Sequence, residues 1–129
     1  MTPHDLAVRM LVKAAQDEAA ADHLIHAPTV GEETVGFHLQ QAAEKLLKAV
    51  LAENDIPYDL SHNLLYLLQL LEAGGTRPPA EMRELGMLNP FAVAFRYDLL
   101  PDVSAFDRSK AQALVADLRT WCEARVPRP

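Results

Sequence analysis

The sequence lacks the features that would mark a secreted, membrane-spanning or strongly basic protein. A single cysteine, Cys122, excludes an internal disulfide and a cysteine-based zinc site. No apolar run approaches the roughly 18 residues of a membrane span, and the N-terminus carries an early acid where a secretory signal would be apolar. Lys and Arg number 12 against 18 Asp and Glu, whereas a protein that holds nucleic acid through bulk charge is basic. These absences predict a soluble, cytoplasmic domain with no membrane contact.

Helix-forming residues make up most of what is present. The 129 residues are 50% hydrophobic and 23% charged, which is the composition of one globular domain with one core. Ala, Leu, Glu, Lys and Gln dominate between the Gly and Pro marks, and no run of alternating β-branched residues occurs. The sequence therefore predicts an all-α fold. Short connections between long helices favour an up-and-down bundle of about five helices, the first two long and antiparallel.

The expected helices follow from apolar periodicity and from the punctuating residues. Ser61 is predicted to cap the third helix and Gly74-Gly75 to end it. A shorter amphipathic helix is expected before the break at Asn89-Pro90, and another apolar turn or two after it. The predicted ranges are 5–27, 32–54, 61–73, 79–88 and 105–125.

The second range has the most regular pattern. One half of its helical wheel is apolar and is expected to face the core. The opposite arc is polar and also carries Phe37, which indicates either a contact outside the core or a second packing face. The apolar positions are Val35, Leu39, Ala42, Ala43, Leu46, Leu47, Ala49 and Val50; the polar ones are His38, Gln41, Glu44, Lys45 and Lys48.

Two charged residues interrupt otherwise apolar segments. Asp17 interrupts or borders the apolar face of the first helix, so it either points into water or is held inward by a cation. Arg96 is the one charged residue in the apolar segment 91–97. We predict a structural Asp17–Arg96 pair; the alternative is that Arg96 projects into a groove and meets an anion.

Familiar catalytic and metal-binding patterns are weak or missing. His23 and His26 are spaced as metal ligands on one helix, but no third ligand follows at a fixed spacing, so no metal site is predicted. The Gly74-Gly75 pair precedes two prolines and not the helix of a phosphate-binding loop. Ser61 and His62 do not make a nucleophile and base, because Ser61 serves better as a helix cap. No cofactor is predicted.

One constellation is more specific. Residues 37–49 follow the pattern F-H-x-Q-Q-A-x-E-K-x-x-K-A, then His62 begins an H-N-L element, and Arg96 and Tyr97 form an R-Y element. With an acidic residue at Asp17, this order resembles the HEPN family of small helical domains, from about residue 5 to about residue 125. The resemblance implies a bundle of about five helices that dimerises. It also implies a frequent genetic pairing with a minimal nucleotidyltransferase, as toxin and antitoxin.

Several HEPN domains are metal-independent ribonucleases, and this sequence departs from them. Those members carry an Arg followed four to six residues later by a His, which act on the ribose 2′-hydroxyl and the attacked phosphate. No Arg in this sequence has a His at that spacing, and all five histidines precede Arg96. The resemblance therefore implies a domain without the family's catalytic pair.

The leading interpretation is a non-catalytic HEPN domain that binds a nucleotide or RNA and a minimal nucleotidyltransferase. Two alternatives stay open: a homodimeric interaction module in which the polar stripe makes interhelical hydrogen bonds, and a metal-independent ribonuclease toxin that uses His62 or His38 with Arg96. In the leading interpretation Lys and Arg meet phosphate, Gln and His meet base or sugar, and an aromatic ring stacks. The candidate ligand contacts are His38, Gln41, Lys45, Lys48, His62, Arg96 and Tyr97.

Overall fold

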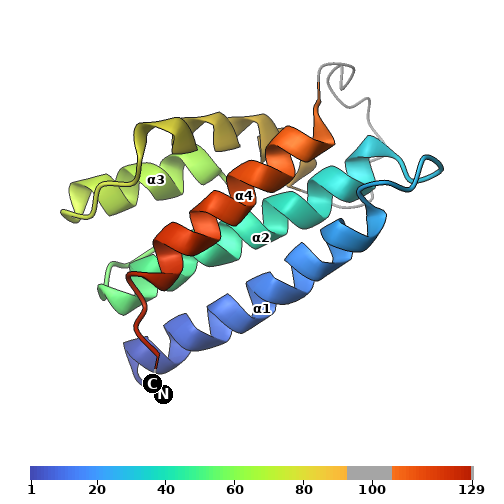
Figure 1. Cartoon of the computed structure of the whole chain (residues 1–129). Helices are drawn as coiled ribbons and strands as arrows, with labels where there is room; N and C mark the ends of the chain where they lie inside the picture. The colour runs from blue at the N-terminus through green and yellow to red at the C-terminus, as the bar shows by residue number, and fades with distance from the viewer. Residues whose placement is uncertain (93–105, 129) are drawn as a thin grey trace.

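The computed structural model describes residues 1–92 and 106–128, and within them the chain is an all-α bundle, as predicted. Figure 1 shows α1 and α2 lying antiparallel as a long hairpin, with α4 running alongside α2 and α3 on the side of α2 away from α1. The central helix, α2, packs against each of the other four elements. The elements are α1 (Pro3–Leu24), α2 (Glu32–Glu53), α3 (Leu64–Ala73), the 3₁₀ helix η1 (Ala80–Phe91) and α4 (Arg108–Glu123).

α1 is two residues longer at its start than predicted and three shorter at its end. Thr2 and Asp5 form a capping box, in which each side chain accepts from the other's backbone N–H, and Pro3 is preorganised for the first turn. Beyond Leu24 the chain turns, and the Arg108 guanidinium donates to the carbonyls of Ile25 and Ala27, each at 3.2 Å. Because helix ends leave such carbonyls unsatisfied, Arg108 fixes the turn between α1 and α2.

Arg108 also joins that turn to the start of α2. Its Nε lies 2.5 Å from Glu32 Oε1, and its guanidinium donates to the Val30 carbonyl. One side chain at the first position of α4 therefore holds both ends of the α1–α2 connection.

α2 is enclosed by its neighbours, and every apolar position predicted for its core face is buried. The helix ends at Glu53, within one residue of the predicted boundary. Part of its polar arc is covered as well: Glu44 and Lys48 are buried, whereas His38, Gln41 and Lys45 are half-buried. The sequence pattern had placed that arc opposite the core.

The predicted cap of the third helix was wrong. α3 begins at Leu64 with Asn63 as the N-cap, and Asn63 Oδ1 accepts from the backbone N–H groups of Leu65 and Tyr66. Ser61 lies outside the helix, where its hydroxyl accepts from the Asn63 N–H at 3.1 Å. An Asn side chain reaches these N–H groups from the helix boundary itself. The helix ends at Ala73 with Gly74 as its C-cap, as predicted.

The segment after α3 is a 3₁₀ helix that runs beyond the predicted break. It continues through Pro90 to Phe91, where a short α-helix over 79–88 was expected. Phe91 is buried against Gly36 of α2, so closely that a methyl group on Gly36 would lie 2.5 Å from the ring. Most of the apolar stretch predicted after Pro90, with Arg96 and Tyr97, lies outside the described residues.

α4 begins three residues later than predicted, with Asp107 as its N-cap. Leu114 and Leu118 are buried as expected, and Trp121 is half-buried. Arg119 binds both carboxylate oxygens of Glu18 on α1, so α1 and α4 are joined by a charged contact as well as by the core. Within residues 1–92 and 106–128, no helix has the length and apolarity needed to cross a bilayer.

Candidate ligand-binding site

The polar residues of α2 gather into two clusters. The first centres on the carboxylate of Glu44. Its Oε2 accepts from Lys48 Nζ at 2.9 Å, and its Oε1 accepts from Gln40 Nε2 at 3.1 Å and from His62 Nδ1 at 2.9 Å. Gln40 Nε2 also donates to the His62 carbonyl at 3.0 Å. This cluster fastens the connection before α3 to the middle of α2.

Glu44 stays ionised despite its burial. Desolvation alone raises the pKa of this carboxyl, but the hydrogen bonds from Lys48, Gln40 and His62 outweigh it, and the net pKa lies below its ordinary value. The Lys48 ammonium pairs with it and lies 5.6 Å from the centre of the Tyr58 ring. Lys48 is therefore held inside the fold by a carboxylate and an aromatic face.

His62 reaches from this buried cluster to the surface. Its Nδ1 is bound to Glu44, while 55% of its side chain is exposed. It lines an open hollow of about 280 Å³ together with Asn63, Asn89 and Ala92. A buried anion thus holds one edge of an imidazole ring whose other edge meets solvent.

The second cluster lies between α1 and α2. Asp17 is held inward by a cation, but in the described residues that cation is Lys45, whose Nζ lies 2.5 Å from Asp17 Oδ2. His38 Nδ1 lies 3.2 Å from the other carboxylate oxygen. Arg96 is outside the described residues, so the Asp17–Arg96 pair stays a prediction.

Phe37 and Gln41 border these clusters. Phe37 is half-buried, and its ring meets that of His38 edge-on, with centroids 5.5 Å apart. Gln41 Nε2 donates to Gln40 Oε1 at 2.7 Å, so it extends the Glu44 cluster along the helix.

Comparison with known proteins identifies the fold that carries these clusters. A family model described as the HEPN domain matches residues 7–126. The chain belongs to the HEPN domain family. Searches of curated proteins and of solved structures gave no match.

Five of the seven predicted contacts of this HEPN domain lie within the described residues. The fold brings Lys48 and His62 together through Glu44, and His38 and Lys45 together through Asp17. It keeps these two pairs in separate clusters. Tyr97 and Arg96 lie outside the described residues and stay predictions.

Sequence reasoning gave no role to Gln40 and Glu44, the residues that organise the first cluster. One signal was present: Gln40, Glu44 and Lys48 are spaced four residues apart, which places them on one stripe of a helix. Four-residue spacing of an amide, an acid and a base permits the hydrogen bonds that the fold forms. The pattern does not show that the stripe is buried.

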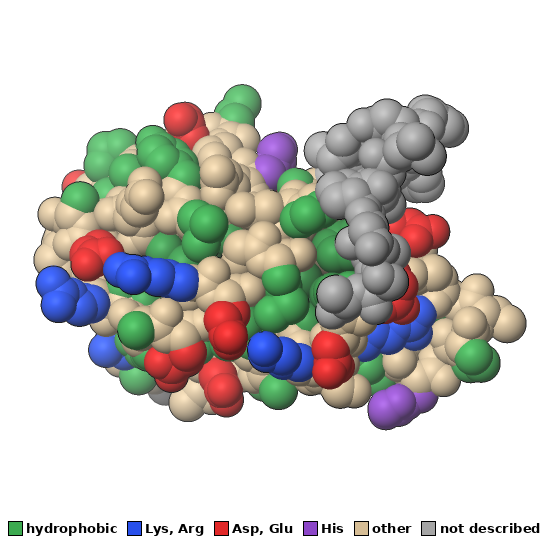
Figure 2. All heavy atoms as spheres, turned by 90° about the horizontal axis from the view of Figure 1, so that it is seen from above, with side chains coloured by type: hydrophobic (Ala, Val, Ile, Leu, Met, Phe, Trp, Pro, Cys, Tyr) green, Lys and Arg blue, Asp and Glu red, His purple; other side chains and the backbone are tan. Residues whose placement is uncertain are grey.

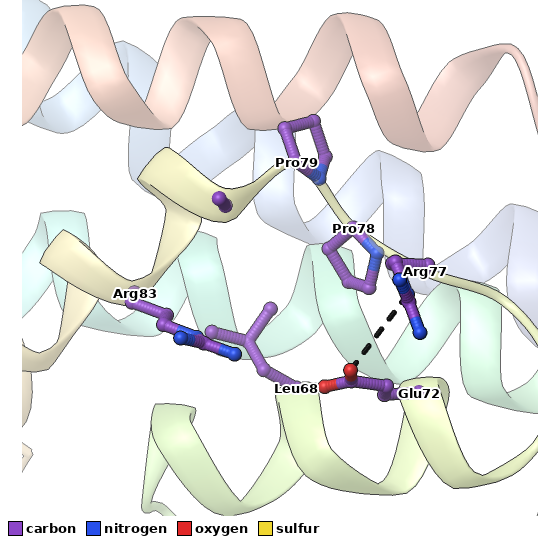
Figure 3. Close-up of a pocket in the computed structure, with 7 residues that line it drawn as sticks. Leu68, Glu72, Arg77, Pro78, Pro79 and Arg83 are labelled. Carbon is purple, nitrogen blue, oxygen red and sulfur yellow. Dashed lines mark ion pairs between the residues drawn. The ribbon is translucent and has the colours of Figure 1, made fainter.

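Within the described residues, one face of the HEPN domain carries no basic patch, a second pocket contains none of the predicted contacts, and no group of side chains forms a metal site. Figure 2 shows Lys and Arg side chains interspersed with Asp and Glu over the described part of one face, with no continuous basic area. A smaller pocket of about 170 Å³ lies between α3 and η1, where Arg77 points toward Glu72 at 3.7 Å (Figure 3). None of the five predicted contacts within the described residues lines it. In the described ranges, no three His, Cys, Asp or Glu side chains are grouped to hold a metal ion.

Proposed function

We propose that this HEPN domain works by binding a nucleotide, free or within RNA, together with a minimal nucleotidyltransferase partner, and that it does not cleave RNA. The supporting observation is His62, which a buried carboxylate holds at the edge of an open hollow. A ring fixed by a charged hydrogen bond is preorganised for a ligand, so binding costs less conformational entropy. The absence of an Arg followed at the family spacing by a His argues against ribonuclease activity.

The proposed phosphate contacts are fewer than the sequence indicated. Lys48 is 10% exposed and neutralised by Glu44, so in this proposal its role is structural. Lys45 keeps 26% of its side chain exposed, so a phosphate could reach it despite its bond to Asp17. We assign Lys45 to phosphate and retain Arg96 and Tyr97 as contacts predicted from the sequence.

A nucleotide titration tests this proposal. ATP or GTP at millimolar concentration should raise Tm, because a ligand that binds only the folded state stabilises it by mass action. The rise should shrink with added salt, since partly exposed charge contacts are screened. It should also shrink in Lys45→Ala but not in Lys13→Ala, which removes an exposed lysine of α1. If no common nucleotide changes Tm, the ligand part of the proposal is wrong.

The partner is tested by co-expression. A minimal nucleotidyltransferase encoded beside this chain should co-purify with it, and the complex should survive gel filtration. Separate elution of two folded proteins would contradict the partnership while leaving nucleotide binding intact.

A second candidate is the homodimeric interaction module without a ligand. The Glu44 cluster favours the absence of a ligand, because Gln40, Lys48 and His62 find partners inside one chain. The homodimer follows from the family resemblance. Polar groups that are satisfied in this way stabilise the fold without any ligand. Sedimentation at micromolar concentration should then give twice the 14.3 kDa chain mass. A monomer that persists into the hundred-micromolar range would contradict the dimer.

A further inference from the structure

We infer that the hollow beside His62 takes the uncharged part of the ligand, the nucleobase or the ribose, and not its phosphate. This inference rests on the proposed function, and it specifies which chemical group meets which side chains. The hollow measures about 280 Å³ and is open to solvent. Pockets for whole drug-sized ligands span about 300–1,000 Å³, so this one has room for a base or a sugar.

In its neutral form His62 supplies a hydrogen-bond acceptor. Its Nδ1 lies 2.9 Å from Glu44 Oε1, and an ionised carboxylate can only accept, so Nδ1 carries the proton. In the neutral ring this tautomer leaves the lone pair on Nε2. No described residue forms a hydrogen bond to Nε2, and more than half of the side chain is exposed. Glu44 therefore determines both the tautomer and the direction of the acceptor.

Asn63 supplies a donor beside it. Its Oδ1 accepts from the N–H groups of Leu65 and Tyr66 and from Asn89 Nδ2 at 3.1 Å. Those three bonds decide the orientation of the amide, so Nδ2 and its two hydrogens form the opposite end. Within the described residues, nothing accepts a hydrogen bond from Nδ2. The helix cap of α3 thus orients a free donor next to the acceptor of His62.

The neighbouring charges favour a neutral ligand group here. Among residues 1–92 and 106–128, no Lys or Arg lines the hollow, and Lys48, which shares Glu44 with His62, is neutralised by that carboxylate. The fully ionised phosphate group of a nucleotide offers only lone pairs, so it cannot donate to Nε2. Nucleobase edges and ribose hydroxyls offer donors and acceptors together, which is what His62 and Asn63 complement.

The test compares nucleosides with phosphate by following the ring nitrogens of His62 in ¹⁵N-labelled protein. Adenosine, guanosine, cytidine, uridine and inorganic phosphate are titrated separately at one ionic strength, and ATP in parallel. At least one nucleoside should shift the His62 Nε2 resonance, and inorganic phosphate should not. His23, which is exposed on α1 and bonded to the Ala19 carbonyl, is the internal reference and should not respond.

Asn63→Asp provides the decisive variant. Aspartate keeps the oxygen that caps α3 but replaces the donor with a second acceptor, so the fold is retained while the complementarity is lost. Nucleoside binding should weaken at least tenfold. Gln69→Glu makes the same change of charge at an exposed position of α3 and should leave binding unchanged.

The outcomes separate the inference from the proposed function. If ATP raises Tm equally in the parent and in Asn63→Asp, and no nucleoside shifts His62, the inference is overturned while nucleotide binding stands. A His62 shift with inorganic phosphate alone also overturns it, because the hollow then takes the charged group. If neither ATP nor any nucleoside binds, both are wrong.

Discussion

Replacing Glu44 by glutamine tests the buried charge cluster that organises α2. The change keeps the length and shape of the side chain and removes its negative charge. The side chains of Glu44 and Lys48 are only 7% and 10% exposed, so the variant leaves a buried ammonium without a counter-charge. Loss of one partner of a buried ion pair costs about 3–5 kcal/mol. We expect about 3 kcal/mol, the lower end, because the amide oxygen still accepts one hydrogen bond.

Urea unfolding at pH 7 measures this loss, and the same helix offers a matched control. Glu53 also pairs with a histidine, His4 at 2.8 Å, but with 18% and 44% of the two side chains exposed. Glu53→Gln should therefore cost about 0–1 kcal/mol, as for surface pairs. Adding Lys48→Met to Glu44→Gln should recover part of the loss, since the stranded charge is gone.

The pH dependence gives a second readout. The folded pKa of Glu44 is lowered, so its stabilisation is complete above the ordinary value of 4.5 and is lost as pH falls through the folded value. The difference in the free energy of unfolding between the parent and Glu44→Gln should be largest at pH 7 and should become smaller below about pH 4.5. A loss under about 1 kcal/mol at pH 7, typical of surface changes, would refute the reasoning.

Three further predictions concern packing. Arg119→Ala should cost about 1.5–3 kcal/mol in urea unfolding, because it breaks charged hydrogen bonds to Glu18; a loss no larger than that of Arg125→Ala at the surface would contradict this. Gly36→Ala should destabilise by about 1–3 kcal/mol through its clash with the Phe91 ring, whereas helix propensity alone would make it more stable. Burial raises the pKa of the Cys122 thiol far above its ordinary value, so a disulfide reagent at pH 8 should label it only on unfolding; rapid labelling of native protein would show that the site is open.

The sequence was informative where local periodicity decides the structure. The bounds of α2 and its apolar face were predicted almost to the residue, because that helix is long and regular. It was less informative about burial of the polar arc. A helical wheel assumes that one face of the helix is exposed to solvent. α2, however, contacts the other four elements, and Lys48 is covered by the connection that carries Tyr58. That covering depends on contacts between distant segments, which periodicity does not encode.

The wrong cap at α3 and the bonding partner of Asp17 both depend on tertiary contacts. Ser61 and Asn63 are both good capping residues two positions apart, and Asn63 is the one that Asn89 of η1 completes with a hydrogen bond. Asp17 bonds Lys45, which lies opposite it in the α1–α2 hairpin, while its predicted pair with Arg96 lies outside the described residues and stays a prediction. Local sequence offers several partners of equal chemistry, and tertiary geometry chooses among them.

The guanidinium of Arg108 has a consequence for the order in which the chain assembles during synthesis. It bonds a carbonyl 78 positions earlier in the chain, at Val30. At about 5–20 residues per second, a ribosome needs about 4–16 s to translate that interval. Once Glu53 has been translated, every residue of the α1–α2 hairpin is present, but its connecting turn has no arginine to satisfy it until Arg108 follows. The turn of the nascent hairpin therefore lacks these hydrogen bonds until α4 is translated and packs against α2, when Arg108 can form them.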